Sequence, residues 1–298
     1  MYNSNNEFFM SPKNDYVFKK IFGDENNKDI LSSFLSCVIN EQINDVSILN
    51  NEITKENTAD KKSILDIRAT INDGVQIGIE IQLSRTIYMP ARSLYYWSKI
   101  YMEQLQIGQI YKKLNRTICI NILDFISTES KKYHSVYRLK ETEENFELTN
   151  LMEIHFIEIP KLKGYEKNDM LSQWINFINA DSREELKKMA IVNKNIDKAF
   201  DILNVMSQSK EERAAYLSRE MALHDEVTKL EEALQEGRQE GRQEGRQEGL
   251  EEGRQEGLEE GEKKKALEIA KNLLDILDNE TIAIKTGLTL DEIENLRK

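Results

Sequence analysis

Three polar residues, Asp66, Glu80 and Gln82, have the types and spacing of a site that binds a cation. The hairpin described next places Asp66 directly opposite Glu80, with Gln82 one pleat further along the same face. Cβ atoms of such a pair lie about 4.5–5.5 Å apart, and like charges so placed destabilise a sheet. A divalent metal such as Mg²⁺ would compensate, because it binds one or two carboxylates and completes its shell with water and phosphate oxygens. The alternative is a solvated polar face whose two acids never share a ligand.

The hairpin that positions these residues is predicted from alternation. Residues 64–71 and 75–83 alternate between apolar and polar, and the turn residues Asn72-Asp73-Gly74 lie between them. A three-residue loop with Gly74 in the left-handed conformation keeps both apolar faces on one side, whereas a one-residue slip would reverse one of them. The register then pairs Ile67 with Ile79, and Asp66 with Glu80.

Further helices and strands are predicted on both sides of the hairpin. Apolar periodicity and the positions of proline and glycine separate helices from strands, and the chain is helical almost throughout after residue 168. Helices are expected over 11–22, 27–40 and 90–107, and strands over 46–53, 117–125, 133–139 and 152–159.

Charge and composition limit the classes of function. The net charge of −12 argues against broad affinity for nucleic acid, but the acidic excess lies toward the C-terminus. A basic cluster after the hairpin serves either ordinary helix solubility or contacts with phosphates. It consists of Arg85, Arg92, Lys99, Lys112, Lys113 and Arg116.

The location expected from the sequence is the cytoplasm. No apolar run approaches the length of a membrane span, so no membrane partner is expected, and the N-terminus lacks the regions of a signal peptide. Cys37 and Cys119 lie in apolar settings and are interpreted as reduced, buried thiols. With only three histidines beside them, a structural zinc site is not expected.

A tetrapeptide repeat occupies residues 235–262, with a glycine every four residues from Gly237 to Gly261 and a glutamate before each. Each glycine costs about 1 kcal/mol in a helix, and glutamates four residues apart repel each other. An isolated helix should therefore be marginal. The repeat is either a helix that self-associates through close backbone approach or a flexible spacer. An apolar seam before it favours self-association: Tyr216, Leu217, Met221, Val227, Leu230 and Leu234.

The tail after residue 263 has the outline of helix, glycine turn and helix. Thr289 caps the last helix, and Glu292 completes a capping box three residues later. With so few basic residues, packing or dimerisation is a better interpretation than DNA reading.

The order of helix, strand, acidic hairpin, helix and strand resembles the core of the PD-(D/E)XK nuclease superfamily. More specifically, the chain resembles the recombination-promoting nuclease (Rpn) and PD-(D/E)XK transposase group over about residues 10–130, with an echo near the C-terminus. The resemblance rests on Asp15 to Gly23, Leu65-Asp66-Ile67, Ile79-Glu80-Ile81-Gln82, Arg92-x-x-Tyr95-Tyr96, Gln104-Leu105-x-x-Gly108-x-x-Tyr111 and Ile282-Ala283-x-x-Thr286-Gly287-Leu288-Thr289.

The resemblance implies an α/β fold with a restriction-endonuclease-like core, in which helices flank a mixed central sheet, followed by an all-helical C-terminal extension. The regions expected are a nuclease domain over 1–185, a helical region over 186–234, the repeat over 235–262 and a small helical tail over 263–298.

The activity implied is that of a Mg²⁺-dependent DNA endonuclease linked to recombination or mobile DNA. Asp66, Glu80 and the Ile81 carbonyl would hold the metal, and Gln82 would position the water, although Lys is usual at that position in the superfamily. Arg92 is a candidate source of positive charge, and Asp15 a candidate helper from the first helix. The alternatives are a catalytically silent relative that binds DNA or protein, and an oligomeric scaffold built by the repeat.

Overall fold

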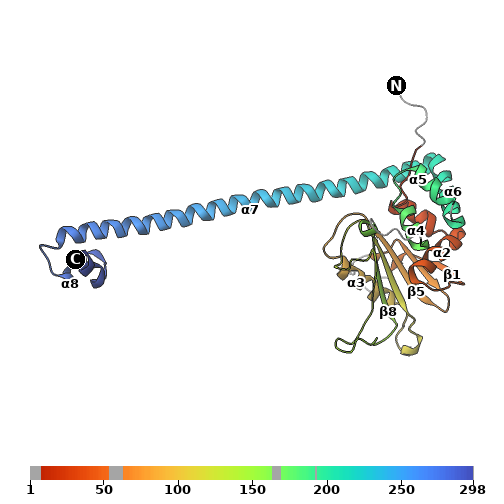
Figure 1. Cartoon of the computed structure of the whole chain (residues 1–298), viewed down its shortest axis with the longest axis horizontal. Helices are drawn as coiled ribbons and strands as arrows, with labels where there is room; N and C mark the ends of the chain where they lie inside the picture. The colour runs from red at the N-terminus through yellow and green to blue at the C-terminus, as the bar shows by residue number, and fades with distance from the viewer. Residues whose placement is uncertain (1–7, 54–62, 163–168, 192, 298) are drawn as a thin grey trace, which may run out of the picture. The chain divides into compact units, whose positions relative to one another are not determined.

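A computed structural model describes residues 8–53, 63–162, 169–191 and 193–297 (Figure 1). The chain divides into two compact units, Met1–His224 and Asp225–Lys298. Among the described residues, no helix combines the length and apolarity that a membrane crossing needs.

A mixed six-stranded sheet forms the centre of the first unit, in the order β1-β4-β5-β6-β8-β7. The β5, β6 and β8 strands run parallel to their neighbours in this group, and the remaining pairs are antiparallel. This confirms the predicted α/β class. The strands are β1 (Val46–Leu49), β4 (Ile67–Ile71), β5 (Val75–Gln82), β6 (Thr117–Leu123), β7 (His134–Tyr137) and β8 (Met152–Glu158), with β2 (Glu52–Ile53) and β3 (Ser63–Ile64) in a separate two-stranded sheet.

The β4–β5 hairpin has the predicted register. Ile71 pairs with Val75, and Ile67 with Ile79. Gly74 has φ of +95°, the left-handed conformation that the three-residue loop requires. The ladder stops at the Ile67–Ile79 pair, one residue before the acids.

Helices cover both faces of the sheet and build two cores. One face packs against α1 (Asp15–Phe22), α2 (Lys28–Ile39), α4 (Met170–Ile178), α5 (Arg183–Ala190) and α6 (Lys194–Gln208), and this core includes the fully buried Trp174. The other face packs against α3 (Met89–Met102). A Cβ on Gly78 would lie 2.7 Å from Ile100 Cδ1, so the glycine permits the close approach of α3 to β5.

Two sequence expectations change in detail. The α3 helix ends at Met102 and not at Ile107. Cys119 is buried as predicted, but Cys37 is only partly so, and both thiols are free. The division of the chain at residue 185 stays a prediction, although α5 and α6 pack on the first unit.

The repeat lies within α7 (Lys210–Leu273), a continuous helix of 64 residues. The flexible-spacer interpretation is therefore wrong. The Glu, Arg and Gln residues between the glycines are good helix formers, and they offset part of the cost of glycine. A Cβ added at any glycine from Gly237 to Gly261 would meet no atom within 4 Å. Self-association of this helix stays a prediction.

The end of the second unit is a small helical module. The last turns of α7 pack with α8 (Asn279–Thr286) and α9 (Leu290–Leu296) around Ala270, Ile282 and Ile293. Thr289 and Glu292 form the predicted capping box, and Gly287 ends α8 with φ of +74°. The tail is therefore a packed module, as its sequence predicts.

Candidate active site

Asp66 occupies a bend just before β4. Its Oδ2 accepts a hydrogen bond of 2.7 Å from the Ile81 main-chain N–H. The carboxylate thus takes the place of the main-chain partner that a longer β4 would supply. The prediction that Asp66 and Glu80 form a regular strand pair is wrong in this respect, because the chain bends to bring the Asp66 side chain onto the β5 backbone.

Glu80 projects from β5 toward α3 and is 5% exposed. One oxygen, Oε1, accepts a hydrogen bond from the Arg92 guanidinium. The other, Oε2, is buried with no hydrogen-bond partner among the residues that the structure describes. Burial and the nearby Asp66 raise the pKa of Glu80 to about 8, and Arg92, Lys19 and the Asp66 amide offset only part of this effect. The charged form of Glu80 is therefore costly in this position.

Asp66 forms an ion pair with a lysine of α1. Lys19 Nζ lies 2.8 Å from Asp66 Oδ1 and 3.6 Å from Asp15 Oδ2. Burial raises the pKa of Asp66, and Lys19 opposes that rise. On the outer side, Arg219 Nε from α7 lies 2.7 Å from Asp15 Oδ1. Three segments that are distant in sequence, α1, the bend at Asp66 and α7, therefore meet at these carboxylates.

Arg92 connects Gln82 to the acids. Its Nη1 donates to Gln82 Oε1 at 3.3 Å, while Gln82 Nε2 donates to the Ser84 carbonyl at 3.2 Å. The guanidinium also lies 5.3 Å from the centre of the Tyr96 ring. Arg92 thus joins both predicted catalytic residues of β5, and the structure brings Asp66, Glu80, Ile81 and Gln82 together at one edge of the sheet.

The donor set fits a hard divalent cation. Burial raises the pKa of both carboxylates, Asp66 raises that of Glu80 further, and Glu80 Oε2 is buried without a partner among the described residues, so a metal would stabilise the charged forms of both. The N–H and C=O of one strand residue point to the same side, so the Ile81 carbonyl points to the side on which Asp66 binds its N–H. No group of three His, Cys, Asp or Glu ligands occurs in the described ranges. A site of two carboxylates suits Mg²⁺, which keeps several waters.

Sequence reasoning missed two of the cations. Lys19 lies four residues after Asp15, a spacing that places both on one side of a helix and could have signalled its role. Arg219 is 204 residues from its partner and left no such signal. One residue of the basic cluster lies elsewhere, because Arg116 binds Glu41 at 2.6 Å and Glu153 at 2.9 Å.

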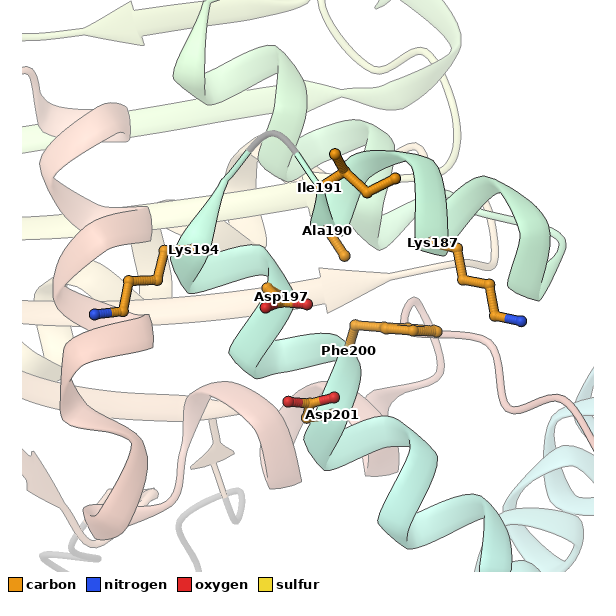
Figure 2. A pocket seen from close by; sticks show the side chains of 7 residues that line it. All are labelled: Lys187, Ala190, Ile191, Lys194, Asp197, Phe200 and Asp201. Carbon is orange, nitrogen blue, oxygen red and sulfur yellow. The ribbon is translucent and has the colours of Figure 1, made fainter.

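A surface pocket between α5 and α6 also carries charged groups (Figure 2). Lys187 and Lys194 point to opposite sides of it, so their charges do not converge on one point. This makes it a weaker candidate than the paired carboxylates. Its lining is Lys187, Ala190, Ile191, Lys194, Asp197, Phe200 and Asp201.

Comparison with protein-family models gives a match to the PD-(D/E)XK nuclease family transposases over residues 12–233. The matched range holds all the residues of the paired-carboxylate site, from Asp15 to Arg219. Comparisons with curated proteins and with solved structures give no significant match.

Proposed function

The chain belongs to the PD-(D/E)XK nuclease family transposases, and from this premise we propose that it is a Mg²⁺-dependent DNA endonuclease. It hydrolyses phosphodiester bonds, and its task is recombination or the movement of mobile DNA. The place of action that suits such a chain is the cytoplasm, with DNA as its main partner.

In this proposal the residues that hold the metal are Asp66, Glu80 and the Ile81 carbonyl. A bound divalent ion lowers the pKa of a water ligand and stabilises the charge that develops on the phosphate. Asp66 is fixed for this role by its bond to the Ile81 amide. Lys19, whose Nζ lies 2.8 Å from Asp66 Oδ1, favours the charged form of this carboxylate and orients it.

Gln82 and Arg92 divide the work that a lysine does elsewhere in the superfamily. The amide of Gln82 both donates and accepts, so it can orient the attacking water, but it carries no charge. The Arg92 guanidinium, hydrogen-bonded to Gln82 at 3.3 Å, supplies positive charge beside it. An arginine pairs well with phosphate oxygens because its donors form a planar fork.

The single observation that carries the proposal is that the charged form of Glu80 is unfavourable in the apo protein. A glutamate with a pKa near 8 and an unpartnered buried oxygen, placed beside a second acid, contributes nothing to an apo fold that an apolar residue could not. Strongly shifted acids of this kind cluster at functional sites.

The test is plasmid cleavage with Mg²⁺, Mn²⁺ or EDTA, comparing wild type with Asp66→Ala. Cleavage is expected with either metal, and neither EDTA nor the variant should allow it. Asp29→Ala is the matched control, because Asp29 is exposed on α2 and pairs with Lys198 at 2.6 Å, away from the site. If Asp66→Ala cleaves as well as wild type, the site assignment is wrong.

A catalytically silent relative that binds DNA or protein is the second candidate. Gln82 in place of lysine favours it, because a neutral side chain cannot stabilise the phosphorane. Isothermal titration with Mg²⁺, run beside the cleavage assay, separates the two: a nuclease binds the metal and cleaves, whereas a silent relative does not cleave even where it binds the metal. Metal binding without any cleavage of plasmid or oligonucleotide would support the silent relative.

Self-association through α7 is the further part of the proposal. Leu217, Met221, Leu230 and Leu234 are between 47% and 67% exposed, as a seam for a second chain requires. Tyr216 is not part of that seam, because it is buried against Phe8 in the first unit. Truncation after Leu234 should lower the oligomeric state in light scattering and leave cleavage detectable. A full chain that is monomeric at micromolar concentrations would contradict this.

A further inference from the structure

One side of α3 carries aromatic and basic residues in alternation. Tyr88, Arg92, Tyr95, Lys99 and Met102 follow at steps of four, three, four and three residues, which keeps them within roughly 80° of the helix circumference. Tyr88 directly precedes the helix and is 71% exposed, Tyr95 is 40% exposed and Met102 is 56% exposed. We call these five residues the α3 stripe.

The surroundings of the α3 stripe are basic, although the whole chain is acidic. Residues 84–116 contain six lysines and arginines and one acid, Glu103, in a chain with a net charge of −12. Glu103 Oε2 lies 2.8 Å from Arg68 Nη2, so its charge is compensated locally. Lys99 Nζ lies 5.7 Å from the centre of the Tyr95 ring. The stripe therefore presents aromatic faces together with cations, the combination that complements stacked bases on a phosphate backbone.

The α3 stripe is continuous with the carboxylate site. Its second member, Arg92, contacts both Glu80 and Gln82. From Arg92 to its end at Met102 the helix extends over about 15 Å, at 1.5 Å per residue. Beyond its end, Tyr111 is 83% exposed and is followed by the exposed Lys112 and Lys113. Aromatic and basic side chains therefore extend from the carboxylate site along α3 and beyond its end.

We propose that the α3 stripe binds a single-stranded segment of the DNA substrate, with Tyr88 and Tyr95 stacking on unpaired bases and Lys99 contacting phosphates. This inference rests on the proposed function and adds the substrate class. A duplex hides its base faces within the stack, so exposed tyrosines on a convex helix gain their contacts from unpaired nucleotides. Phosphate contacts alone would serve a duplex equally well and would not require the aromatic members.

The test is fluorescence anisotropy of a labelled oligothymidylate and of a duplex of equal length, in EDTA, with the full chain. Tyr88→Ala and Tyr95→Ala should each weaken oligothymidylate binding by about tenfold, the usual effect of losing one base-stacking aromatic, and should change duplex binding much less. Tyr95→Trp should restore binding, because it keeps a stacking ring. Phe146→Ala, at a residue 55% exposed outside this region, is the matched control and should bind like wild type.

Several outcomes would overturn the inference. Equal losses for single strand and duplex would mean phosphate contact without stacking, and an equal loss for Phe146→Ala would mean a non-specific effect. Unchanged DNA binding with an altered oligomeric state in light scattering would assign the α3 stripe to a second copy of the chain. Because binding is measured without metal, single-strand binding that depends on the tyrosines but comes without cleavage would refute the nuclease and keep the stripe. Cleavage by the wild type together with unchanged single-strand binding by the tyrosine variants would refute the role of the α3 stripe and leave the proposed nuclease standing.

Discussion

Two buried glutamates in the same sheet, Glu80 on β5 and Glu153 on β8, meet their cations in opposite ways. Glu153 is 2% exposed and accepts hydrogen bonds from Arg116 at 2.9 Å, Arg138 at 2.7 Å and His155 at 2.6 Å. Burial alone would raise its pKa, but His155 and Arg116 lower the pKa of Glu153 to about 2. Glu80 has one arginine and a pKa of about 8. The fold can satisfy a buried carboxylate fully, and at Glu80 it does not.

Two histidines beside Glu153 complete its hydrogen-bond network. His155 Nδ1 lies 2.8 Å from His134 Nε2, and burial together with His155 lowers the pKa of His134 to about 4. His134 is therefore neutral at pH 7 and completes a chain of hydrogen bonds without adding charge. A buried acid whose partners are all supplied by the protein stabilises the fold, whereas an acid left short of partners is available to a ligand.

The largest expected effects come from replacing each of the two glutamates by glutamine. Glu80→Gln should abolish Mg²⁺-dependent cleavage and leave the apo protein no less stable than wild type at pH 7, because Glu80, with a pKa of about 8, is already mostly neutral there. Glu153→Gln should destabilise the fold by about 3–5 kcal/mol, since it strands Arg116 and Arg138, while the folded fraction still cleaves. Urea unfolding in EDTA and plasmid cleavage measure the two effects. A large loss of stability for Glu80→Gln would mean that Glu80, like Glu153, stabilises the fold.

The same comparison shows what the sequence could predict. The hairpin register and the meeting of Asp66, Glu80 and Gln82 followed from alternation, because the side-chain period of a strand is strict. The bend at Asp66 could not be predicted, because it depends on a side chain that replaces a main-chain bond. The Asp15–Arg219 and Glu153–Arg116 pairs were missed because each joins segments that are distant in sequence, and no local spacing records such contacts.

The next effect is a pH dependence of opposite sign at the two acids. Glu80 has a folded pKa raised above that of the unfolded chain, so its contribution to stability is full below about pH 4.5 and is lost as pH rises toward 8. The slope is at most about 1.4 kcal/mol per pH unit. The folded pKa of Glu153 is lowered, so its contribution is present above about pH 4.5 and is lost as pH falls toward 2. Urea unfolding of wild type, Glu80→Gln and Glu153→Gln across pH, in EDTA, checks both signs.

The affinity for Mg²⁺ should also depend on pH through Glu80. Below pH 8 a proton must leave Glu80 before the ion binds, so Mg²⁺ affinity should rise by up to about tenfold per pH unit and then level off. Titration calorimetry in buffers of different ionisation enthalpy would count the released proton. Binding that releases no proton at pH 7 would mean that Glu80 is already charged there, like Glu153.

A moderate effect is expected from Gln82→Lys. The residue is partly exposed on β5, so the variant should fold. It removes the oxygen that accepts from Arg92 and places a second cation beside the guanidinium, so cleavage should fall on the order of tenfold, as for other residues that orient a metal site. Lysine is the superfamily's usual residue here, so some activity should remain. Complete loss of cleavage with intact Mg²⁺ binding would show that water positioning in this site depends on the amide itself.

The smallest expected effect is on stability, and it compares an exposed arginine that pairs with Asp15, Arg219, with the arginine that pairs with Glu153, Arg116. Arg219 is 44% exposed and pairs with Asp15 at 2.7 Å, whereas Arg116 is 16% exposed and pairs with the buried Glu153. An exposed pair is worth less than about 1 kcal/mol, so Arg219→Gln should barely change the urea midpoint. Arg116→Gln should cost about 3–5 kcal/mol, because it leaves a buried carboxylate short of a partner. If the two variants lose equal stability, Arg219 is part of the structural core, and α7 holds α1 and its Lys19 in place by more than packing.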